Sequence, residues 1–254
     1  MTDSFGRWIG AVLDVPAEQV EAADGFWSQA LGWTVGDPWP QHAEFHSLLP
    51  PEGNSHVLVQ TIDGPSRVHL DLYTEDVASE SDRAVGLGGA RVARHEHWQV
   101  LESPGGLPFC VVTSEDERHR PPVQEWPSGR RSRLVQVCVD IPHGRLDEET
   151  AFWRAVTGWE FKPSASVEFA GHLKPGPGGS LQLLLQELGP DDPAATTRAH
   201  LDLGAGDDRR AEAERLVALG AEWVREYPWW IVMTDPVGMT FCVTGQGPDQ
   251  PPQR

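Results

Sequence analysis

The 254-residue chain repeats one sequence pattern along its length, and this repetition limits the fold more than any single motif. The two copies match in the same order over about 100 residues, which is typical of the duplication of a structural unit. Three pairs of segments match: 12–33 with 138–159, 67–72 with 198–203, and 103–112 with 235–244. We therefore expect one domain that occurs twice rather than two unrelated domains.

The two copies also set the expected domain boundaries. We expect the first domain at 1–114 and the second at 133–245. Residues 115–132, between them, are charged and contain prolines without a clear period, so they are expected to form a linker. The end of the chain, 246–254, is polar and rich in proline and is expected to be disordered.

Each copy alternates strand-like and helix-like segments. In the first copy, the apolar run at 7–15 predicts a strand, and Pro16 is expected to open a helix because proline suits the first helical turn. Apolar residues then recur at three- and four-residue spacing up to Leu31, and Gly32 is expected to end the helix in a left-handed conformation. The remaining segments are expected as strands near 43–49, 56–62, 67–74, 90–94, 96–102 and 107–113, with a second helix over 76–89. The predicted order is βαβββ, twice in each copy, in an α+β fold.

The charge balance excludes several classes of partner. With 38 Asp+Glu against 20 Lys+Arg, the chain has a net charge of −18. Phosphate backbones and anionic membrane surfaces attract positively charged proteins and repel such a chain. No apolar run reaches the roughly 18 residues of a transmembrane helix, and the N-terminal segment has no signal-peptide core. Cys110, Cys138 and Cys242 are too few for a disulfide scaffold, which fits a reducing compartment. We therefore expect a cytoplasmic protein with a small-molecule ligand and no nucleic-acid or membrane partner.

The order of these elements resembles the vicinal oxygen chelate superfamily. The shared features are LGW at the end of the first helix, an HLDL strand, a helix ending in LG, and a DPxG turn before the last strand. That superfamily includes glyoxalase I, extradiol dioxygenases, fosfomycin-modifying enzymes and bleomycin-sequestering proteins, and the chain looks like its glyoxalase-like domain group in tandem. The resemblance covers residues 7–113 and 133–244. It implies two glyoxalase-like domains in which four βαβββ modules form two cup-shaped, mostly antiparallel sheets.

The resemblance also implies where a catalytic metal would be bound. Catalytic members hold one divalent metal through ligands on the first, fifth and last strands of a cup. In the second copy these positions carry Gln136, His200 and Cys242, which are the candidate metal ligands. Cysteine stands where the family normally has glutamate, and thiolate is a poor substitute for carboxylate toward hard cations. Any metal is therefore expected to be a divalent ion such as Zn, Ni, Mn or Fe.

The first copy has fewer candidate metal ligands at the same positions. Gly10 offers no side chain, whereas His69 and Cys110 match the family's histidine and the replaced glutamate. His69 and His200 also have a simpler interpretation, as histidines that line a core or a pocket. The cysteines, each flanked by Phe and Val, are interpreted as small buried apolar residues with inert thiols.

Two further patterns lie close to these positions in the sequence. Asp71 and Asp202 follow the histidines by two residues and so share their strand face. We interpret them as solvated or hydrogen-bonded carboxylates, with orientation of the histidines as the alternative. His95 and His97 would point to one face if they lay on a strand and could then share a metal, although we interpret them as a solvated or pocket-edge pair.

The composition of 11 Trp against 2 Tyr provides large, rigid aromatic surface. Four tryptophans match between the copies around the first helix and are expected in the core: Trp27, Trp33, Trp153 and Trp159. Six others fall on or near strands that would line the cups: Trp8, Trp39, Trp98, Trp223, Trp229 and Trp230. The expected ligand-binding residues are Trp8, His69, Trp98, Gln136, His200 and Trp230.

These features leave two hypotheses for function. The first is a protein that binds a small, cationic or aromatic molecule in an open cup without the family's catalytic metal. The second is a divalent-metal-dependent lyase or dioxygenase of the glyoxalase or extradiol type, in which the metal polarises vicinal oxygens of the substrate. A tandem chain of this kind is expected to be a monomer or a homodimer.

Overall fold

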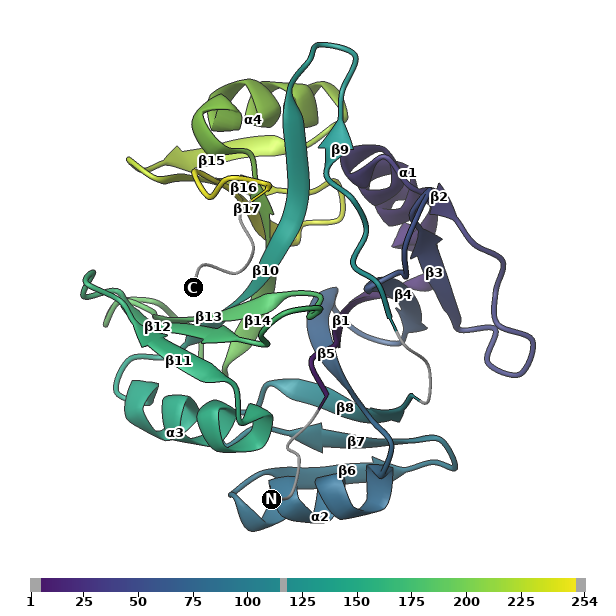
Figure 1. Cartoon of the computed structure of the whole chain (residues 1–254), viewed down its shortest axis with the longest axis vertical. Coiled ribbons are helices and arrows are strands. Elements are labelled where there is room, and N and C mark those ends of the chain that lie inside the picture. The colour runs from purple at the N-terminus through teal and green to yellow at the C-terminus, as the bar shows by residue number, and fades with distance from the viewer. Residues whose placement is uncertain (1–5, 115–117, 250–254) are drawn as a thin grey trace. The chain divides into compact units, whose positions relative to one another are not determined.

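The computed structural model describes residues 6–114 and 118–249, which form four βαβββ modules (Figure 1). The first module contains β1 (Ile9–Pro16), α1 (Val20–Leu31), β2 (Thr34–Val35), β3 (Phe45–Leu49) and β4 (Val57–Ile62). The second contains β5 (Arg67–Thr74), α2 (Val77–Gly86), β6 (Ala90–Arg94), β7 (Trp98–Glu102) and β8 (Pro108–Thr113).

The second half of the chain repeats this order. A short strand, β9 (Gln124–Glu125), precedes it. The third module contains β10 (Arg131–Ile141), α3 (Leu146–Thr157), β11 (Glu160–Pro163), β12 (Phe169–Lys174) and β13 (Gln182–Glu187). The fourth contains β14 (Arg198–Gly204), α4 (Arg209–Ala218), β15 (Glu222–Glu226), β16 (Trp230–Thr234) and β17 (Thr240–Thr244).

The strands form two open sheets of matching topology. One has the order β2-β3-β4-β1-β5-β8-β7-β6, and the other has the order β11-β12-β13-β10-β14-β17-β16-β15. The hairpin partners are antiparallel, whereas β1 with β4, β5 with β8, and β14 with β17 are parallel. The predicted α+β fold with four βαβββ modules and a tandem duplication is therefore confirmed.

Several local predictions need correction. Pro16 ends β1 and is followed by a 3-10 turn, so that α1 begins only at Val20. Gly32 does end α1 in the left-handed conformation, with φ of 70°. Trp33 and Trp159 were expected in the core, but both are only half-buried because they follow the helix ends. The expected linker contains β9, which pairs with the start of β10. Of the expected disordered tail, residues 250–254 lie outside the described residues.

The described chain divides into two compact units, each made from both halves of the sequence. Unit I comprises residues 6–10, 69–114, 118 and 137–199, and unit II comprises residues 11–68, 119–136 and 200–249. Unit I thus holds α2 and α3, while unit II holds α1 and α4. The domain boundaries expected from the sequence follow the repeats instead and remain a prediction.

The core of unit II packs α1 against the last module. Trp27 and Phe26 meet the ring of Phe241 with centroid distances of 5.3 and 5.6 Å. The indole nitrogen of Trp27 donates a 2.8 Å hydrogen bond to Asp235 in the turn before β17. Asp235 also accepts from the backbone amide of Met239 at 2.8 Å, so one buried carboxylate joins the helix to the turn. Burial raises the pKa of Asp235, although these hydrogen bonds oppose the rise.

The core of unit I repeats this packing with different residues. Trp153 and Phe152 of α3 meet Phe109, at centroid distances of 5.3 and 5.9 Å. Here the carboxylate is Glu149, which accepts from Trp153 Nε1 at 2.9 Å and from the amide of Gly105 at 2.5 Å. Glu149 is fully buried, and burial raises its pKa. The same connection between helix and turn is therefore made by a carboxylate on the helix in unit I and by a carboxylate in the turn in unit II.

The positions of the two carboxylates are complementary between the repeats. Glu149 aligns with Ala23 in the first copy, and Asp235 aligns with Ser103. Each unit thus keeps one carboxylate, on the helix in unit I and on the turn in unit II. A second carboxylate in the same core would place two like charges out of water, which is costly.

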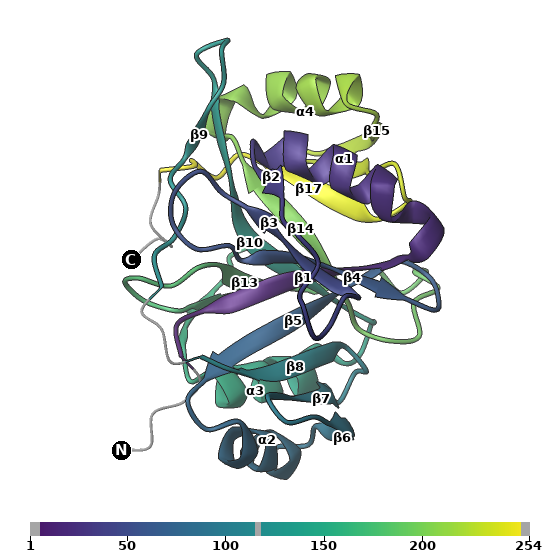
Figure 2. The same cartoon turned by 90° about the vertical axis from the view of Figure 1, so that its right-hand side faces the viewer.

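In both units an arginine side chain caps the C-terminal end of a helix, α1 in unit II and α3 in unit I. In unit II, Arg215 of α4 donates to the carbonyl of Ala30 at 2.8 Å and is held by Glu212 at 2.8 Å. In unit I, Arg83 of α2 donates to the carbonyl of Val156 at 2.6 Å. These guanidinium groups satisfy carbonyls that the last turn of a helix leaves without partners. Figures 1 and 2 show α1 and α4 side by side over β17 in unit II.

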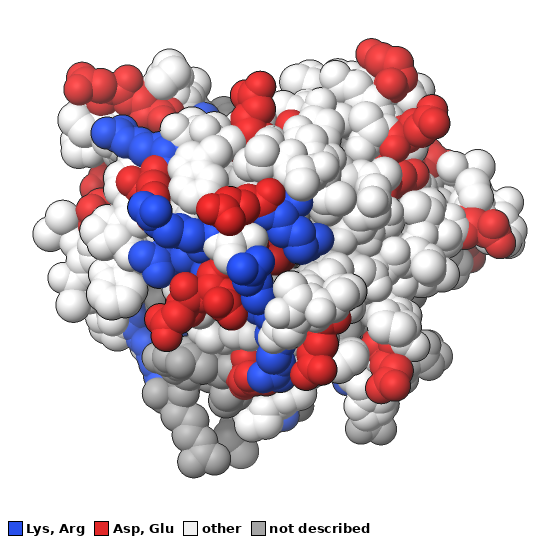
Figure 3. Space-filling view, turned by 90° about the horizontal axis from the view of Figure 1, so that it is seen from above, with Lys and Arg blue, Asp and Glu red and all other residues white. Residues whose placement is uncertain are grey.

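The surface carries both signs of charge. On the face drawn in Figure 3, Lys and Arg side chains lie among Asp and Glu side chains rather than in a separate basic area. Arg210 with Glu226 at 2.7 Å and Arg131 with Asp249 at 2.5 Å are ion pairs of unit II. Among the described helices, none combines the length and apolar character needed to cross a bilayer.

Replacement of Asp235 by alanine tests the carboxylate between helix and turn. We expect Asp235→Ala to lower the free energy of unfolding by about 2–4 kcal/mol, because Trp27 Nε1 and the turn amides lose a buried acceptor. Urea unfolding followed by circular dichroism measures this loss. Asp191→Ala, at an exposed position, should change stability by less than about 0.5 kcal/mol. Equal effects of the two substitutions would contradict the assignment.

Candidate functional site

Unit II brings together one imidazole, one carboxylate and one thiol on neighbouring strands. β14 pairs with β17 in parallel, with Asp202 opposite Cys242. His200 precedes Asp202 by two residues and therefore shares its strand face. His200 Nε2 lies 3.4 Å from Cys242 Sγ and 3.3 Å from Asp202 Oδ1. All three side chains are buried. We call this set the second triad.

Gln136 supports the second triad from β10. Its amide nitrogen donates to Asp202 Oδ2 at 2.5 Å, and its side chain is buried. The other carboxylate oxygen, Asp202 Oδ1, is buried and makes no hydrogen bond among the described residues, although it faces His200 Nε2. Gln136, expected as a ligand, thus contacts the second triad through its hydrogen bond to Asp202, and Asp202 is a further donor that the sequence did not assign. The prediction of Gln136 as a metal ligand remains untested.

Unit I contains the same three residue types at the equivalent positions. β5 pairs with β8 in parallel, with Asp71 opposite Cys110. His69 Nε2 lies 3.8 Å from Cys110 Sγ and 3.5 Å from Asp71 Oδ1, and all three residues are buried. We call this set the first triad. In each triad the donor atoms lie within 4.8 Å of one another.

The carboxylate and the sulfur approach the same ring nitrogen in both triads. A proton relay of the Cys-His-Asp kind uses both nitrogens, one toward the nucleophile and the other toward the carboxylate. A single imidazole nitrogen has either one proton or one lone pair to offer, so it can satisfy one of two such partners well. The geometry is therefore unsuited to a relay and suited to a shared cation.

The separations can be compared with those of a zinc-type site. Bonds of about 2.0–2.3 Å from a tetrahedral ion to N, O and S donors place the donors about 3.3–3.6 Å apart. The second triad has separations of 3.3 and 3.4 Å, and the first has 3.5 and 3.8 Å. The two separations from the histidine nitrogen in the second triad thus match those of such an ion, while those in the first are longer by up to a few tenths of an ångström.

The other residues expected to bind a ligand are spread over both units. Trp8 is buried, whereas Trp98 and Trp230 are half-buried at equivalent positions of β7 and β16. Trp98 stacks on His95 at 4.3 Å, and Trp230 stacks on Tyr227 at 4.6 Å. Trp39, Trp223 and Trp229, which were also expected on or near cup-lining strands, are exposed, Trp229 most of all at 73%. The ligand-binding assignments remain predictions.

The structure also places the two carboxylates and the histidine pair that the sequence singled out. Asp71 and Asp202 are buried beside the histidines rather than solvated, and Asp202 is hydrogen-bonded, as one part of the sequence interpretation expects. The sequence could have indicated this arrangement, because both aspartates follow a histidine by two residues and such a spacing puts the two side chains on the same face of a strand. His95 and His97 lie in an exposed turn rather than on a strand, so the expected shared strand face does not exist.

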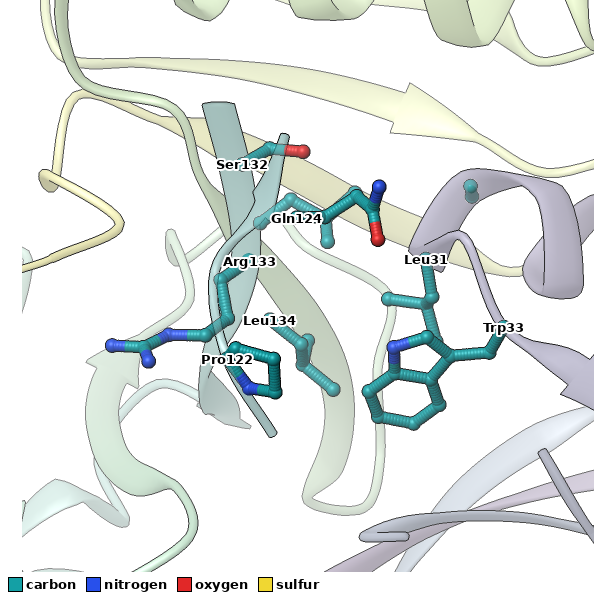
Figure 4. A pocket seen from close by; sticks show the side chains of 9 residues that line it. Leu31, Trp33, Pro122, Gln124, Ser132, Arg133 and Leu134 are labelled. Carbon is teal, nitrogen blue, oxygen red and sulfur yellow. The ribbon is translucent and has the colours of Figure 1, made fainter. Parts of the chain in front are cut away.

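A recess of unit II has none of the second-triad residues in its lining (Figure 4). Leu31 and Trp33 line one side, and Pro122, Gln124 and Leu134 line the other. Figure 4 shows the guanidinium of Arg133 directed away from Trp33. The enclosed space there is about that of a single water molecule, whereas ligand pockets usually measure roughly 300–1,000 Å³. This recess therefore does not qualify as a binding site for a drug-sized molecule.

His56, in contact with Trp33, is the most strongly perturbed histidine that the structure describes. Its ring lies edge-on to Trp33 with a centroid distance of 5.3 Å, and it is fully buried. Burial lowers the pKa of His56 to about 3, and the charges of Arg120 and Arg133 act in the same direction. His56 is therefore neutral in the folded protein at pH values above its lowered pKa of about 3.

Comparison with known proteins agrees with the topology. The family described as glyoxalase-like domain matches residues 10–112 and 136–244, which together include both copies. No curated protein sequence matches the chain.

Solved structures with similar topology include a mutant form of 4-hydroxymandelate synthase from Streptomyces coelicolor, at 17% identity over 97% of this chain and 94% of that one, with a TM-score of 0.61. Another is 2,2',3-trihydroxybiphenyl 1,2-dioxygenase from Sphingomonas wittichii, at 11% identity over 96% and 90%, with a TM-score of 0.58. Homoprotocatechuate 2,3-dioxygenase from Arthrobacter globiformis has 13% identity over 95% and 79%, with a TM-score of 0.58. At such identities the similarity shows the fold alone.

The buried His56 predicts an acid-dependent loss of stability. Below its ordinary pKa of 6.5, the unfolded chain takes up a proton that the folded chain refuses, so stability falls as the pH drops from 6.5 toward 3. The slope should approach about 1.4 kcal/mol per pH unit. Urea unfolding at pH 7.0, 5.5 and 4.5 should show a shallower fall for His56→Leu than for the parent. His119→Gln, at an exposed position, should keep the parent slope, and an unchanged slope in His56→Leu would refute the prediction.

Proposed function

The chain belongs to the glyoxalase-like domain family, and from this we propose that its second copy binds one divalent cation of the zinc class together with a small molecule that offers neighbouring oxygen atoms. The observation behind the proposal is the convergence of Asp202 Oδ1 and Cys242 Sγ on His200 Nε2, at 3.3 and 3.4 Å. A cation between the three donors accounts for their approach to one point.

The donor set decides the class of cation. The carboxylate expected on the last strand is replaced by Cys242, and Asp202 supplies a carboxylate from β14 instead. One imidazole, one carboxylate and one thiolate suit zinc, nickel or cobalt, whereas magnesium and calcium prefer oxygen donors alone. Gln136 positions the carboxylate, because its amide holds Asp202 Oδ2 at 2.5 Å and leaves Oδ1 directed at His200.

The same donor set favours one reaction class over the other. A cation of this class, when bound, supplies a Lewis acid that polarises oxygens of the substrate. Iron-dependent oxygenases typically use two histidines and one carboxylate, and the second triad has a single histidine. The triad therefore supports a non-redox lyase or isomerase reaction better than a dioxygenase reaction.

The surroundings support a small-molecule ligand in a reducing compartment. Lys and Arg side chains lie among acidic ones on the face in Figure 3 and offer no separate basic area there to a nucleic acid. The three cysteines are buried free thiols, a state that persists in the cytoplasm. Cytoplasmic location and the absence of nucleic-acid or membrane partners are therefore part of this proposal.

A second candidate function is metal-independent capture of a flat aromatic molecule, favoured by the two aromatic stacks. Trp98 with His95 and Trp230 with Tyr227 occupy equivalent positions of the two copies. The half-buried indoles of these stacks offer an apolar face to a planar ligand at little entropic cost, because stacking already holds them. The acidic net charge of −18 would favour a cationic one.

Metal content tests the first candidate. We expect the purified protein to hold zinc, nickel or cobalt by elemental analysis, and His200→Ala to hold one equivalent less than the parent. His143→Ala serves as the matched control because His143 is an exposed histidine. Equal metal content in the parent and His200→Ala would refute the proposal. Oxygen uptake with catechol after loading with ferrous iron would favour the dioxygenase reaction instead.

Tryptophan fluorescence tests the second candidate. We expect quenching by the flat cation ethidium to be stronger than by the anion anilinonaphthalene sulfonate, because the chain is acidic. Loss of one stack in Trp98→Phe or Trp230→Phe should weaken ethidium binding by about 2–10-fold. Trp39→Phe is the control, since Trp39 stacks on Phe45 and takes part in neither of these stacks. Equal affinity in all variants would rule out the stacks as the binding site.

A further inference from the structure

We propose that the first triad, His69, Asp71 and Cys110, is a second and independent site for a zinc-class cation. The resemblance to the family assigns ligands by position, and by that rule the first copy retains only His69 and Cys110. The structure adds Asp71, which lies on the same strand face as His69 and opposite Cys110 in the register of β5 and β8. This inference uses other residues than the proposed function and does not depend on it.

In the first triad, as in the second, the carboxylate and the sulfur approach the same nitrogen of the histidine ring, whereas a proton relay would use both ring nitrogens. Asp71 Oδ1 at 3.5 Å and Cys110 Sγ at 3.8 Å both approach His69 Nε2. One nitrogen cannot serve both partners fully as donor and acceptor, whereas a cation held between the three atoms would be a ligand partner for all of them. The donors come from two adjacent strands of unit I, so the site is held by the sheet itself.

Burial increases the need for a positive charge at this site. His69, Asp71 and Cys110 have exposed fractions of only 5%, 7% and 8%. Burial of a carboxylate beside a thiol is costly unless a charge compensates it. Arg118 of the same unit stacks on the rings of Tyr73 at 4.4 Å and Trp8 at 5.8 Å, and its Nε donates to Ser114.

The two sites differ in how firmly the carboxylate is held. In unit II, Gln136 donates to Asp202, but the aligned residue in the first copy is Gly10, which has no side chain to donate to Asp71. A carboxylate without this support loses more freedom when it binds a cation. We therefore expect the first triad to bind the same class of cation more weakly than the second. Binding converts the thiol to a thiolate and releases its proton to the solvent.

Cobalt titration tests this inference on the whole chain. After removal of metals with a chelator, Co²⁺ is added, and the thiolate-to-cobalt charge-transfer absorbance in the near ultraviolet is followed. The parent should bind two equivalents with two affinities. Cys110→Ser should lose the weaker equivalent and Cys242→Ser the tighter one. Cys138→Ser, which removes the third buried thiol, should keep both. Asp71→Asn provides a nearly isosteric second variant, which should weaken the first site without removal of the thiolate.

The outcomes separate the two sites. Two equivalents in the parent and one in Cys110→Ser would support the inference. A single equivalent that Cys242→Ser removes and Cys110→Ser leaves intact would overturn it, while the proposed function would stand. A single equivalent lost only in Cys110→Ser would support the inference and refute the proposed function. Loss of an equivalent in Cys138→Ser, or unchanged affinity in Asp71→Asn with its circular dichroism spectrum preserved, would overturn the assigned ligand set.

Discussion

The parallel pairing of the fifth and last strands in each copy is the constraint on which both candidate sites depend. In that register Asp71 faces Cys110, and Asp202 faces Cys242. The histidine two residues earlier lies on the same face, so three donor types meet without help from a loop. Sites built on strands keep their geometry better than sites built on loops. The metal chemistry proposed for the chain follows from this pairing.

A second constraint holds the helices against the sheets. Each unit joins a buried tryptophan to a turn through one carboxylate, Glu149 in unit I and Asp235 in unit II. After duplication, the carboxylate has been kept on the helix in one unit and on the turn in the other. Such a core has one acceptor for the indole and the turn amides, and it avoids the cost of a second buried charge. The repeats thus diverge in sequence while the hydrogen bonds they make stay equivalent.

The elements were predictable to within a few residues because their signals are local. The apolar period ending at Leu31, with Gly32 beyond it, marks α1 correctly. Pro16 was assigned to a helix, although it ends β1, because a proline that opens a helix and one that ends a strand look alike in sequence. The exposed turn at His95 was read as strand for a similar reason. Alternation alone does not show where hydrogen bonding between neighbouring strands stops.

By itself, the sequence determined the duplication, the βαβββ order, the α+β class and the residues His69, His200, Cys110 and Cys242 as a repeated set. Periodicity and repetition are properties of the chain, so no coordinates are needed to find them. Only the tertiary structure decided that Asp71 and Asp202 complete the triads, and that Gln136 holds Asp202 through its amide nitrogen. It also decided that each compact unit draws on both halves of the chain. The register between distant strands and the direction of a buried amide depend on contacts across more than 30 residues, and packing determines these contacts where local preference does not.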